Sequence, residues 1–232
     1  MSEVKIKIEN LYKIFGPRAK EHINKVKSGI DKDELLAKYN HVLGLDNINL
    51  DIKEQSIQVV MGLSGSGKST LIRHINRLIE PTEGTVLVDG EDITKLNKAD
   101  LLEFRRNKTG MVFQRFALFP HHNILDNVQF GLSIKNLDKS ESKDKAMYWI
   151  EKVGLTGFEN KFPNQLSGGM QQRVGLARAL AIDPDILLMD EAFSALDPLI
   201  RTDMQDQLLD LQKNLKKTII FITHDLDEAL KL

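Results

Sequence analysis

The sequence predicts an α/β fold: a parallel sheet flanked by helices, with an antiparallel β part and an inserted helical part. The apolar runs Ile186–Met189 and Thr218–Thr223 are each long enough for a buried strand, and polar residues follow both. The run Ser56–Met61 predicts a third buried strand, which leads through a glycine-rich turn into a helix over Ser69–Leu78. Apolar and charged residues alternate over Val4–Ile8, as in a half-buried antiparallel strand.

The composition limits the classes of function. The 232 residues carry a formal net charge of −1, which gives no basic footprint, so we expect no nucleic-acid partner. The absence of cysteine excludes disulfides, thiolate metal sites and cysteine nucleophiles. We expect no signal peptide, and no apolar run approaches the roughly 18 residues of a membrane-spanning helix. If the protein acts at a membrane, we therefore expect it to bind peripherally and not to span the bilayer.

The segment Pro17–Asn40 departs from the strand pattern on either side of it. Its apolar residues fall on one helical face, and Asp31 with Glu34 has the spacing of a capping box. We therefore expect a small helical hairpin, after which the strand pattern resumes at Ile48–Ile52. The hairpin is either a solvated, charged lid or an interaction surface.

The glycine-rich turn fits the phosphate-binding motif G-x-x-x-x-G-K-[ST], with a strand before it and a helix after it. Glycines let the backbone wrap closely around phosphates, and the helix N-terminus favours an anion. Lys68 is expected to reach the β- and γ-phosphates, and the Ser69 hydroxyl to hold Mg²⁺. We predict a nucleoside triphosphate here, in contact with Gly62, Ser64, Gly65, Ser66, Gly67, Lys68, Ser69 and Thr70.

The middle of the chain predicts further elements: a strand Thr85–Val88 with a turn at Asp89-Gly90, a helix Ala99–Arg106, a strand Met111–Phe113 and a mostly helical stretch Asn123–Pro163. The segment Phe116–Pro120 is unusually apolar for a loop, so it is either tucked into its own domain or open to a partner. His121 and His122 have no third ligand nearby, so we do not expect them to bind a metal.

A second candidate phosphate site begins at Ser167, which is a good N-cap for a helix that buries Val174 and Ala177. Gly168 and Gly169 are poor helix formers in its first turn, which indicates that the backbone closely approaches another group. A helix start of this kind suits a phosphate.

The predicted parallel strands end in polar residues. Asp190 and Glu191 end one of them; an aspartate in this place supports Mg²⁺ in P-loop ATPases, and a neighbouring glutamate can polarise an attacking water. Because the carboxyl ends of such strands gather at one edge of the sheet, we expect five side chains to converge there: Lys68, Gln114, Asp190, Glu191 and His224.

These motifs, in this order and spacing, resemble those of an ABC-type ATP-binding cassette over almost the whole chain: the glycine-rich loop, Gln114, LSGGM, LLMDE, SALD and His224. The resemblance implies a RecA-like core, a helical subdomain and an antiparallel β subdomain. On this basis residues 1–232 form one ATP-binding domain, in which 1–115 and 164–232 make the β subdomain and core, 17–40 is a helical insertion, and 116–163 is the helical subdomain.

The resemblance also implies roles for single residues. Two copies would sandwich two ATP, and Glu191 would be the catalytic base, His224 the γ-phosphate switch, and Gln114 a Mg²⁺ contact and sensor. Phe15 falls where the family stacks an aromatic ring on adenine; Tyr12 is a rival, and core packing is the alternative for Phe15. The residues implied to contact nucleotide, besides the glycine-rich loop, are Phe15, Gln114, Asp190, Ser167, Gly168, Gly169 and Asp197, the last four across the dimer.

The insertion, LSGGMQQRVGLARAL and MDEAFSALDPLIR together resemble the ATPase subunit of glycine betaine/proline-type osmoprotectant importers. This implies a transmembrane permease as partner, a substrate-binding protein as an indirect one, and a peripheral place on the cytoplasmic face of the cell membrane. Such subunits usually continue past the position of Leu232, and they carry arginine where this chain has His122. The alternatives are an importer of another small solute or a non-transport ABC ATPase, although no heptad run of the kind found in chromosome-maintenance ATPases is present.

Overall fold

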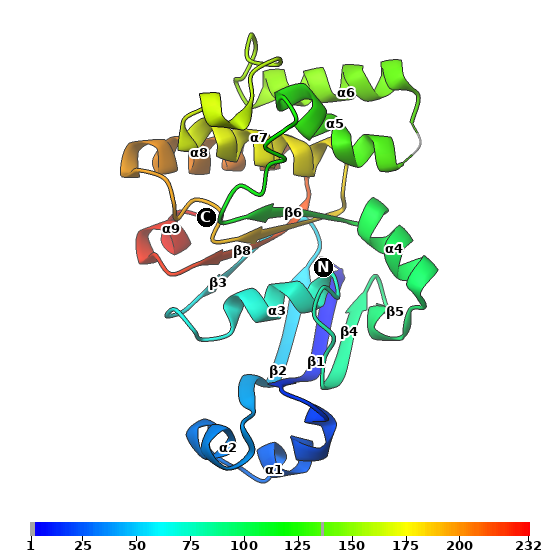
Figure 1. Ribbon diagram of the computed structural model, residues 1–232, viewed down its shortest axis with the longest axis vertical. Coiled ribbons are helices and arrows are strands. Elements are labelled where there is room, and N and C mark those ends of the chain that lie inside the picture. Colours follow the sequence, from blue (N-terminus) through cyan, green and yellow to red (C-terminus); the bar gives the residue numbers. More distant parts are fainter. Residues whose placement is uncertain (1–2, 136) are drawn as a thin grey trace. The chain divides into compact units, whose positions relative to one another are not determined.

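The structure is a computed structural model that describes residues 3–135 and 137–232 (Figure 1). The chain divides into two compact units, one formed by Met1–Glu54 and Gly62–Leu101, the other by Gln55–Met61 and Leu102–Leu232. The first contains an antiparallel sheet and the second a parallel sheet. The predicted α/β class is therefore confirmed.

The sheet of the first unit has the strand order β2-β1-β4-β5. Its strands are β1 (Val4–Phe15), β2 (Val42–Lys53), β4 (Glu83–Val88) and β5 (Glu91–Asp92). β2 begins at Val42, before the expected start at Ile48, because this stretch pairs with the end of β1 although Gly44 interrupts its alternation. The predicted turn at Asp89-Gly90 is present, with φ of 51° and 79°, the left-handed backbone that a two-residue hairpin requires.

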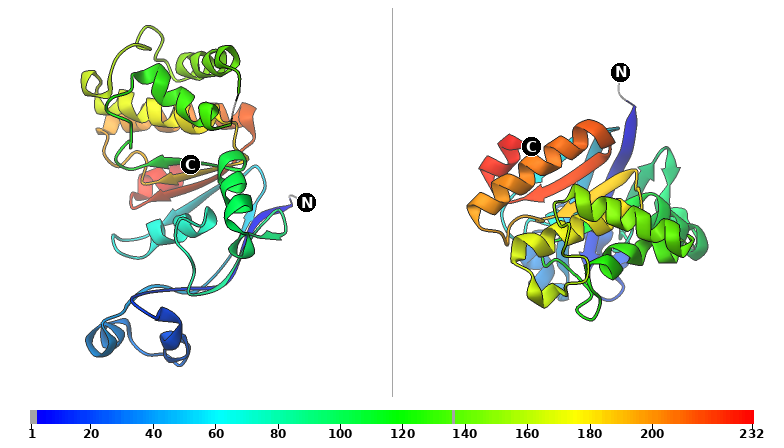
Figure 2. Two further views of the ribbon diagram at one scale, coloured as in Figure 1. Left: turned by 45° about the vertical axis from the view of Figure 1, so that its right-hand side comes forward. Right: turned by 90° about the horizontal axis from the view of Figure 1, so that it is seen from above.

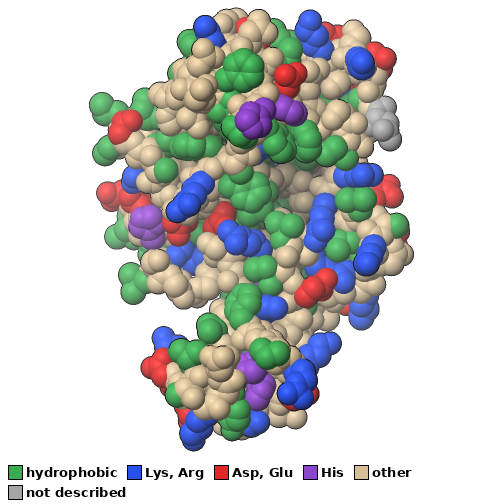
Figure 3. All heavy atoms as spheres, in the orientation of Figure 1, with side chains coloured by type: hydrophobic (Ala, Val, Ile, Leu, Met, Phe, Trp, Pro, Cys, Tyr) green, Lys and Arg blue, Asp and Glu red, His purple; other side chains and the backbone are tan. Residues whose placement is uncertain are grey.

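Between β1 and β2 lies the predicted helical hairpin. It consists of η1 (Ala19–His22), α1 (Ile23–Lys27) and α2 (Lys32–Tyr39), and it buries Val26 and Leu35 against residues of β1. Asp31 caps α2 by accepting a hydrogen bond from the Asp33 N–H at 2.7 Å. The expected capping box is replaced by an ion pair, because Glu34 contacts Lys38 one turn ahead. Figure 3 shows hydrophobic and charged side chains interspersed over this hairpin. The first unit also holds α3 (Lys68–Ile75) and η2 (Ile93–Lys95).

The sheet of the second unit has the order β3-β8-β7-β6, and its strands are parallel. They are β3 (Ile57–Met61), β6 (Thr109–Phe113), β7 (Ile186–Asp190) and β8 (Thr218–Thr223). The strand ends are in register: Met61 pairs with Thr223, and Phe113 with Asp190. All residues of β7 and β8 are buried, which explains why both read as continuous apolar runs.

Helices cover this parallel sheet. They are α5 (Ile124–Ile134), α6 (Lys139–Lys152), η3 (Pro163–Gln165), α7 (Gly168–Ala181), α8 (Pro198–Leu215) and α9 (Leu226–Lys231); the division between the units falls inside α4 (Lys98–Asn107). Figures 1 and 2 show α5, α6 and α7 stacked on one side of the sheet, and their buried residues share one core with β7 and β8. The boundaries 116–163 of a helical subdomain stay a prediction. Within the described residues, no helix is long and apolar enough to span a membrane.

Candidate functional site

The glycine-rich loop connects β3 to α3. Gly65 and Gly67 have φ of 79° and 95°, in the left-handed region that side chains other than glycine rarely adopt. A Cβ on Gly67 would lie 2.5 Å from the carbonyl oxygen of Gly44 in β2. Glycine is therefore required at position 67 for two reasons, the backbone angle and the close approach of a neighbouring strand.

Lys68 begins α3 and lies inside the loop. It is 6% exposed, and its Nζ donates hydrogen bonds to the carbonyl oxygens of Gly62 at 2.8 Å and Leu63 at 2.9 Å. A buried ammonium group must be paired or hydrogen-bonded, and these carbonyls contribute to that. Ser64, Gly65 and Ser66 are exposed above it. The loop thus combines a fixed positive charge, accessible backbone and a helix start, which is the chemistry of a phosphate site.

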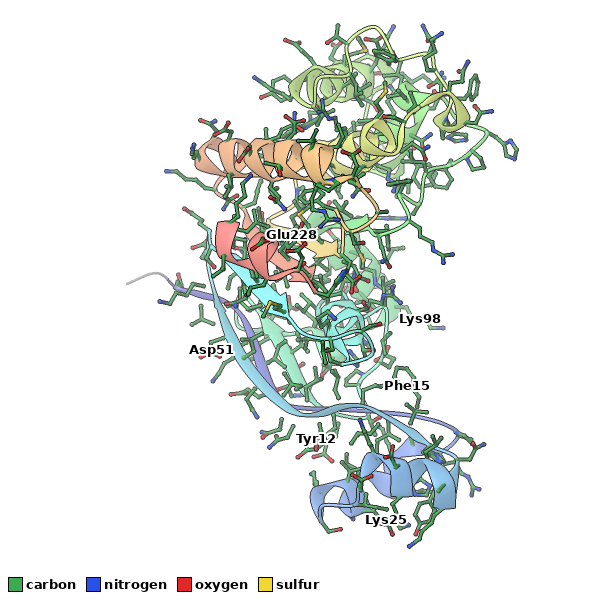
Figure 4. All side chains as sticks on the ribbon, turned by 90° about the vertical axis from the view of Figure 1, so that its left-hand side faces the viewer. Tyr12, Phe15, Lys25, Asp51, Lys98 and Glu228 are labelled. Atoms are coloured by element: carbon green, nitrogen blue, oxygen red, sulfur yellow. The ribbon has the colours of Figure 1, made fainter. Side chains whose placement is uncertain are left out.

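The two aromatic candidates for stacking on a base differ in exposure. Tyr12 is buried in the core beneath the helical hairpin, with Lys27 Nζ 5.6 Å from its ring centroid. Phe15 is 39% exposed and lies against the backbone of Gly44, where a Cβ would come within 2.6 Å of its ring. The two side chains leave β1 in different directions (Figure 4). Phe15 is therefore the accessible aromatic ring of the two.

In the second unit, three polar side chains from three strand ends meet. Gln114 follows β6, Glu191 follows β7, and His224 follows β8. Gln114 Nε2 lies 3.2 Å from Glu191 Oε2, and His224 Nδ1 lies 3.3 Å from the same oxygen. The Glu191 side chain is 15% exposed and that of His224 53%, so the cluster opens to solvent on the histidine side. The predicted convergence is confirmed for these three. Asp190 is the last residue of β7 and directly precedes Glu191. Lys68 belongs to the first unit, and its place with them stays a prediction.

The backbone of Glu191 is held in a strained conformation. Its φ is 47°, which is unfavourable for a residue with a side chain and concentrates at functional sites. Its N–H donates to the Ile222 carbonyl of β8 at 3.1 Å, and the Ser194 hydroxyl donates to its carbonyl at 2.8 Å. These bonds hold the backbone at the position from which the carboxylate contacts Gln114 and His224.

Mg²⁺ prefers oxygen ligands, and the residues predicted to bind it all offer them. Asp190 ends β7 with 4% exposure, and Gln114 carries an amide oxygen next to Glu191. Ser69, in the second position of α3, supplies a hydroxyl. This donor set fits a magnesium ion that also binds phosphate oxygens, and its assembly from both units stays a prediction.

The helix start at Ser167 has the predicted geometry. Ser167 is exposed and caps α7 by accepting from the Met170 N–H at 3.3 Å. A Cβ on Gly169 would lie 2.5 Å from the Ile200 side chain of α8, whereas on Gly168 it would make only ordinary contact, 3.6 Å from Phe116. Packing within the chain thus requires glycine at 169. At 168 it does not, so approach of a ligand is the explanation that we predict for that glycine.

The apolar loop Phe116–Pro120 is fastened to its own unit. The Arg178 guanidinium donates to the carbonyls of Phe116 at 3.2 Å and Ala117 at 2.7 Å, and the buried Asn127 side chain holds both backbone groups of Phe119. The Phe119 ring packs 4.4 Å from that of Phe130 in α5. Next to the loop runs a groove of about 460 Å³ whose lining includes Met111, Phe113, Phe130, Ile134 and Arg178.

Sequence reasoning missed two residues at the strand ends. Ser194 Oγ lies 3.2 Å from Gln114 Nε2 and so joins the Glu191 cluster. Asp225 follows His224 and caps α9, where it accepts from the N–H groups of Asp227 and Glu228. The Glu228 N–H, and with it the Asp227 N–H and the Arg201 guanidinium, hold the pKa of the Asp225 carboxyl below its usual range. Ser194 stands in the SALD motif and Asp225 follows a strand-end histidine, and these are the signals that could have found them.

Comparisons with known proteins agree with this geometry. The sequence model of the ABC transporter family matches residues 45–194. The glycine betaine transport ATP-binding protein OpuAA of Bacillus subtilis is 57% identical over 229 residues, 99% of this chain and 55% of that protein. The glycine betaine/proline betaine transport system ATP-binding protein ProV of Escherichia coli is 54% identical over 229 residues, 99% of this chain and 57% of that protein. The chain thus spans about half the length of the curated relatives it matches.

A solved structure extends the likeness to the fold. The dimeric structure of a post-hydrolysis state of the ATP-binding cassette MJ0796, bound to ADP and Pi, aligns with a TM-score of 0.81 and 35% identity. The alignment covers 97% of this chain and 90% of that one.

The exposure of Phe15 leads to a test of its predicted place beside adenine. We expect Phe15→Ala to weaken binding of an adenine nucleotide by roughly 5- to 150-fold, since an aromatic ring stacked on a base contributes about 1–3 kcal/mol. Phe15→Trp should bind like the wild type, because it keeps a stacking surface. Fluorescence titration with ADP measures both. Wild-type affinity in Phe15→Ala would instead assign the ring to packing against Gly44.

Proposed function

This chain belongs to the ABC transporter family, and from that membership we propose that it is an ATPase that converts ATP and water to ADP and phosphate in order to power solute import. The observation that carries the proposal is Glu191: it directly follows Asp190, has a strained backbone, and receives Gln114 and His224 on one carboxylate oxygen. Clusters of this kind at strand ends are where ligands are bound in open α/β sheets.

In the proposed reaction, the Glu191 carboxylate accepts a proton from the water that attacks the γ-phosphorus. General-base catalysis requires an acceptor within hydrogen-bond reach of that water. Gln114 Nε2 and His224 Nδ1 both lie within 3.3 Å of Glu191 Oε2, so they fix the orientation of the carboxylate that would accept the proton. Lys68 offsets charge on the β- and γ-phosphates. When bound to Ser69, Gln114 and Asp190, Mg²⁺ supplies further neutralisation of phosphate charge.

The proposal includes a second copy of the chain. Ser167, Gly168 and Gly169 form an exposed or half-exposed helix start suited to phosphate. Asp197 caps α8, and Ile200 of that helix lies against Gly169. In a two-fold dimer, one copy's helix start would face the other copy's glycine-rich loop, and this would happen twice. The dimeric, ADP-bound structure of the similar cassette MJ0796 supports this arrangement.

We further propose that the solute is a glycine betaine/proline-type osmoprotectant. The support is the sequence identity, above 50%, with OpuAA and ProV, whose names describe ATP-binding proteins of glycine betaine transport. We propose that the protein lies on the cytoplasmic face of the cell membrane, where a permease holds it. A substrate-binding protein would be an indirect partner. Uptake of labelled glycine betaine by cells that express the full-length protein with its neighbouring transport genes tests this, and uptake of another solute alone would overturn it.

The permease is proposed to dock in the groove beside the Phe116–Pro120 loop. Phe113 and Phe130 give the groove apolar walls, and Arg178 and Phe113 link it to the loop and to Gln114. Arg105, Arg106 and Thr109 also line the groove, and its apolar walls suit the apolar face of a helix. A helix seated there would therefore bear on the residue next to Gln114.

Replacement of the general base tests the chemistry. We expect Glu191→Gln to retain ATP binding and to lose hydrolysis by about 10²–10⁴-fold, the usual cost of removing a general base. The amide keeps the shape of the side chain but cannot accept the proton. Steady-state phosphate release and ATP titration of the full-length protein measure the two quantities. Undiminished turnover would remove Glu191 from the mechanism.

A charge placed in the groove tests the docking site. Ile134 is 37% exposed at the end of α5 and lines the groove, so Ile134→Asp should abolish capture of the permease while ATP affinity stays unchanged. Phe158→Asp is the matched control, because Phe158 is 39% exposed and is not among the groove's lining residues. Co-purification of tagged full-length protein with the permease is the measurement. Equal capture of both variants would direct attention to the 17–40 hairpin.

A further inference from the structure

The turn that carries His224 is held by two residues of α8. Arg201 contacts it directly, and Gln205 contacts it through Glu228 of α9. On the near side, the Thr223 hydroxyl donates to Glu228, and it also accepts from the Asp225 N–H at 2.9 Å. Glu228 is 3% exposed and in turn accepts from Gln205 Nε2 of α8 at 3.1 Å. The imidazole of His224 therefore projects from a backbone whose orientation depends on buried hydrogen bonds to α8.

On the far side, the contact from α8 comes from Arg201. Its Nη1 donates to Asp225 Oδ2 at 2.8 Å, and its Nη2 donates to the carbonyl of Leu196 at 3.2 Å. Arg201 and Gln205 are four residues apart, which places them on the same helical face. The Arg201 side chain is 25% exposed, so water competes only in part for these bonds.

Leu196 belongs to the loop that joins Glu191 to α8. Ser194 in that loop contacts Gln114 and bonds to the Glu191 carbonyl, and Asp197 at its end caps α8. The guanidinium of Arg201 thus links two segments: Nη2 bonds to the 194–197 loop, and Nη1 bonds to the residue after His224. A lysine lacks the planar fork of the guanidinium, because all its donors sit on one nitrogen at the end of a flexible stem, so it cannot hold the two acceptors in the same fixed geometry.

We propose that Arg201 is a positioning residue for ATP hydrolysis: it holds the His224 turn and the 194–197 loop in one fixed relation, so that a displacement of the loop moves His224 relative to Glu191. This rests on the proposed function, which makes Glu191 the base and Asp197 a contact to the second copy. When the second copy closes on Asp197, the resulting movement of the loop is transmitted to His224 through the Arg201 side chain.

The expected effect of its removal is on turnover and not on binding. In Arg201→Met the link is lost, and the Asp225 carboxylate keeps the N–H groups of Asp227 and Glu228 but loses its cationic partner. We expect kcat to fall tenfold or more, within the range known for small misplacements of catalytic groups, with the affinity for ATP unchanged within twofold. Arg201→Lys keeps the positive charge and loses the planar fork, and should give an intermediate kcat.

A second substitution tests the coupling itself. Asp225→Asn keeps the oxygen that caps α9 and removes the charge. Because both changes break the same contact, kcat of Arg201→Met/Asp225→Asn should be no lower than that of Arg201→Met alone. The matched control is Lys217→Met, which removes the ion pair of Lys217 with Asp183 at the opposite end of β8 and should leave kcat unchanged.

The measurement is steady-state ATPase activity and ATP titration of the full-length protein, with thermal unfolding to compare Arg201→Met with Lys217→Met. If Arg201→Met does not fold, Arg201→Lys carries the test with the same readouts. If the wild type is active and Glu191→Gln is inactive, the proposed function stands. A kcat of Arg201→Met equal to that of Lys217→Met would then overturn this inference alone. Multiplicative losses in the double variant would overturn the coupling. An inactive wild type would overturn the proposed function, and the inference with it.

Discussion

Parallel pairing in the order β3-β8-β7-β6 is the constraint on which the candidate site depends. It brings the ends of β6, β7 and β8 to one edge in register, so that Gln114, Glu191 and His224 meet although they lie far apart in the chain. No local propensity produces this meeting. It follows from the burial of continuous apolar strands between helices, which fixes both register and direction.

The same core supports the strain at the site. Glu191 has a left-handed backbone, a conformation that costs of order 1–3 kcal/mol and persists only where the surroundings over-determine it. Ala192 and Phe193, which follow it, are fully buried, and Phe193 packs on Phe221 of β8. The packing of these two residues anchors the chain directly after the strained position. Glu191 can therefore be held toward its partners before any ligand arrives.

Much of the fold and part of the site follow from sequence because their signals are local. Unbroken apolar runs predict the strands, and the polar residue after each run predicts the meeting of Gln114, Glu191 and His224. The contacts of Arg201 with Leu196 and Asp225 are not predictable from sequence, because an arginine on an amphipathic helix is normally expected to be solvated. Its partners are determined by tertiary packing. Glu34 was misassigned for a related reason: a capping box and an i, i+4 ion pair compete for the same carboxylate.

The central element of the proposed function is that each ATP site is completed by a second copy of the chain. Mixing two defective full-length variants, Lys68→Ala and Ser167→Arg, tests it directly through the amount of ATP that remains trapped after rapid removal of free nucleotide. Each homodimer carries a defect in both sites, whereas a mixed dimer gathers both defects in one site and leaves the other intact. We expect trapped ATP to be absent from either variant alone and to reappear on mixing. Its absence from a mixture in which mixed dimers are shown to form would exclude an ATP site shared between two copies.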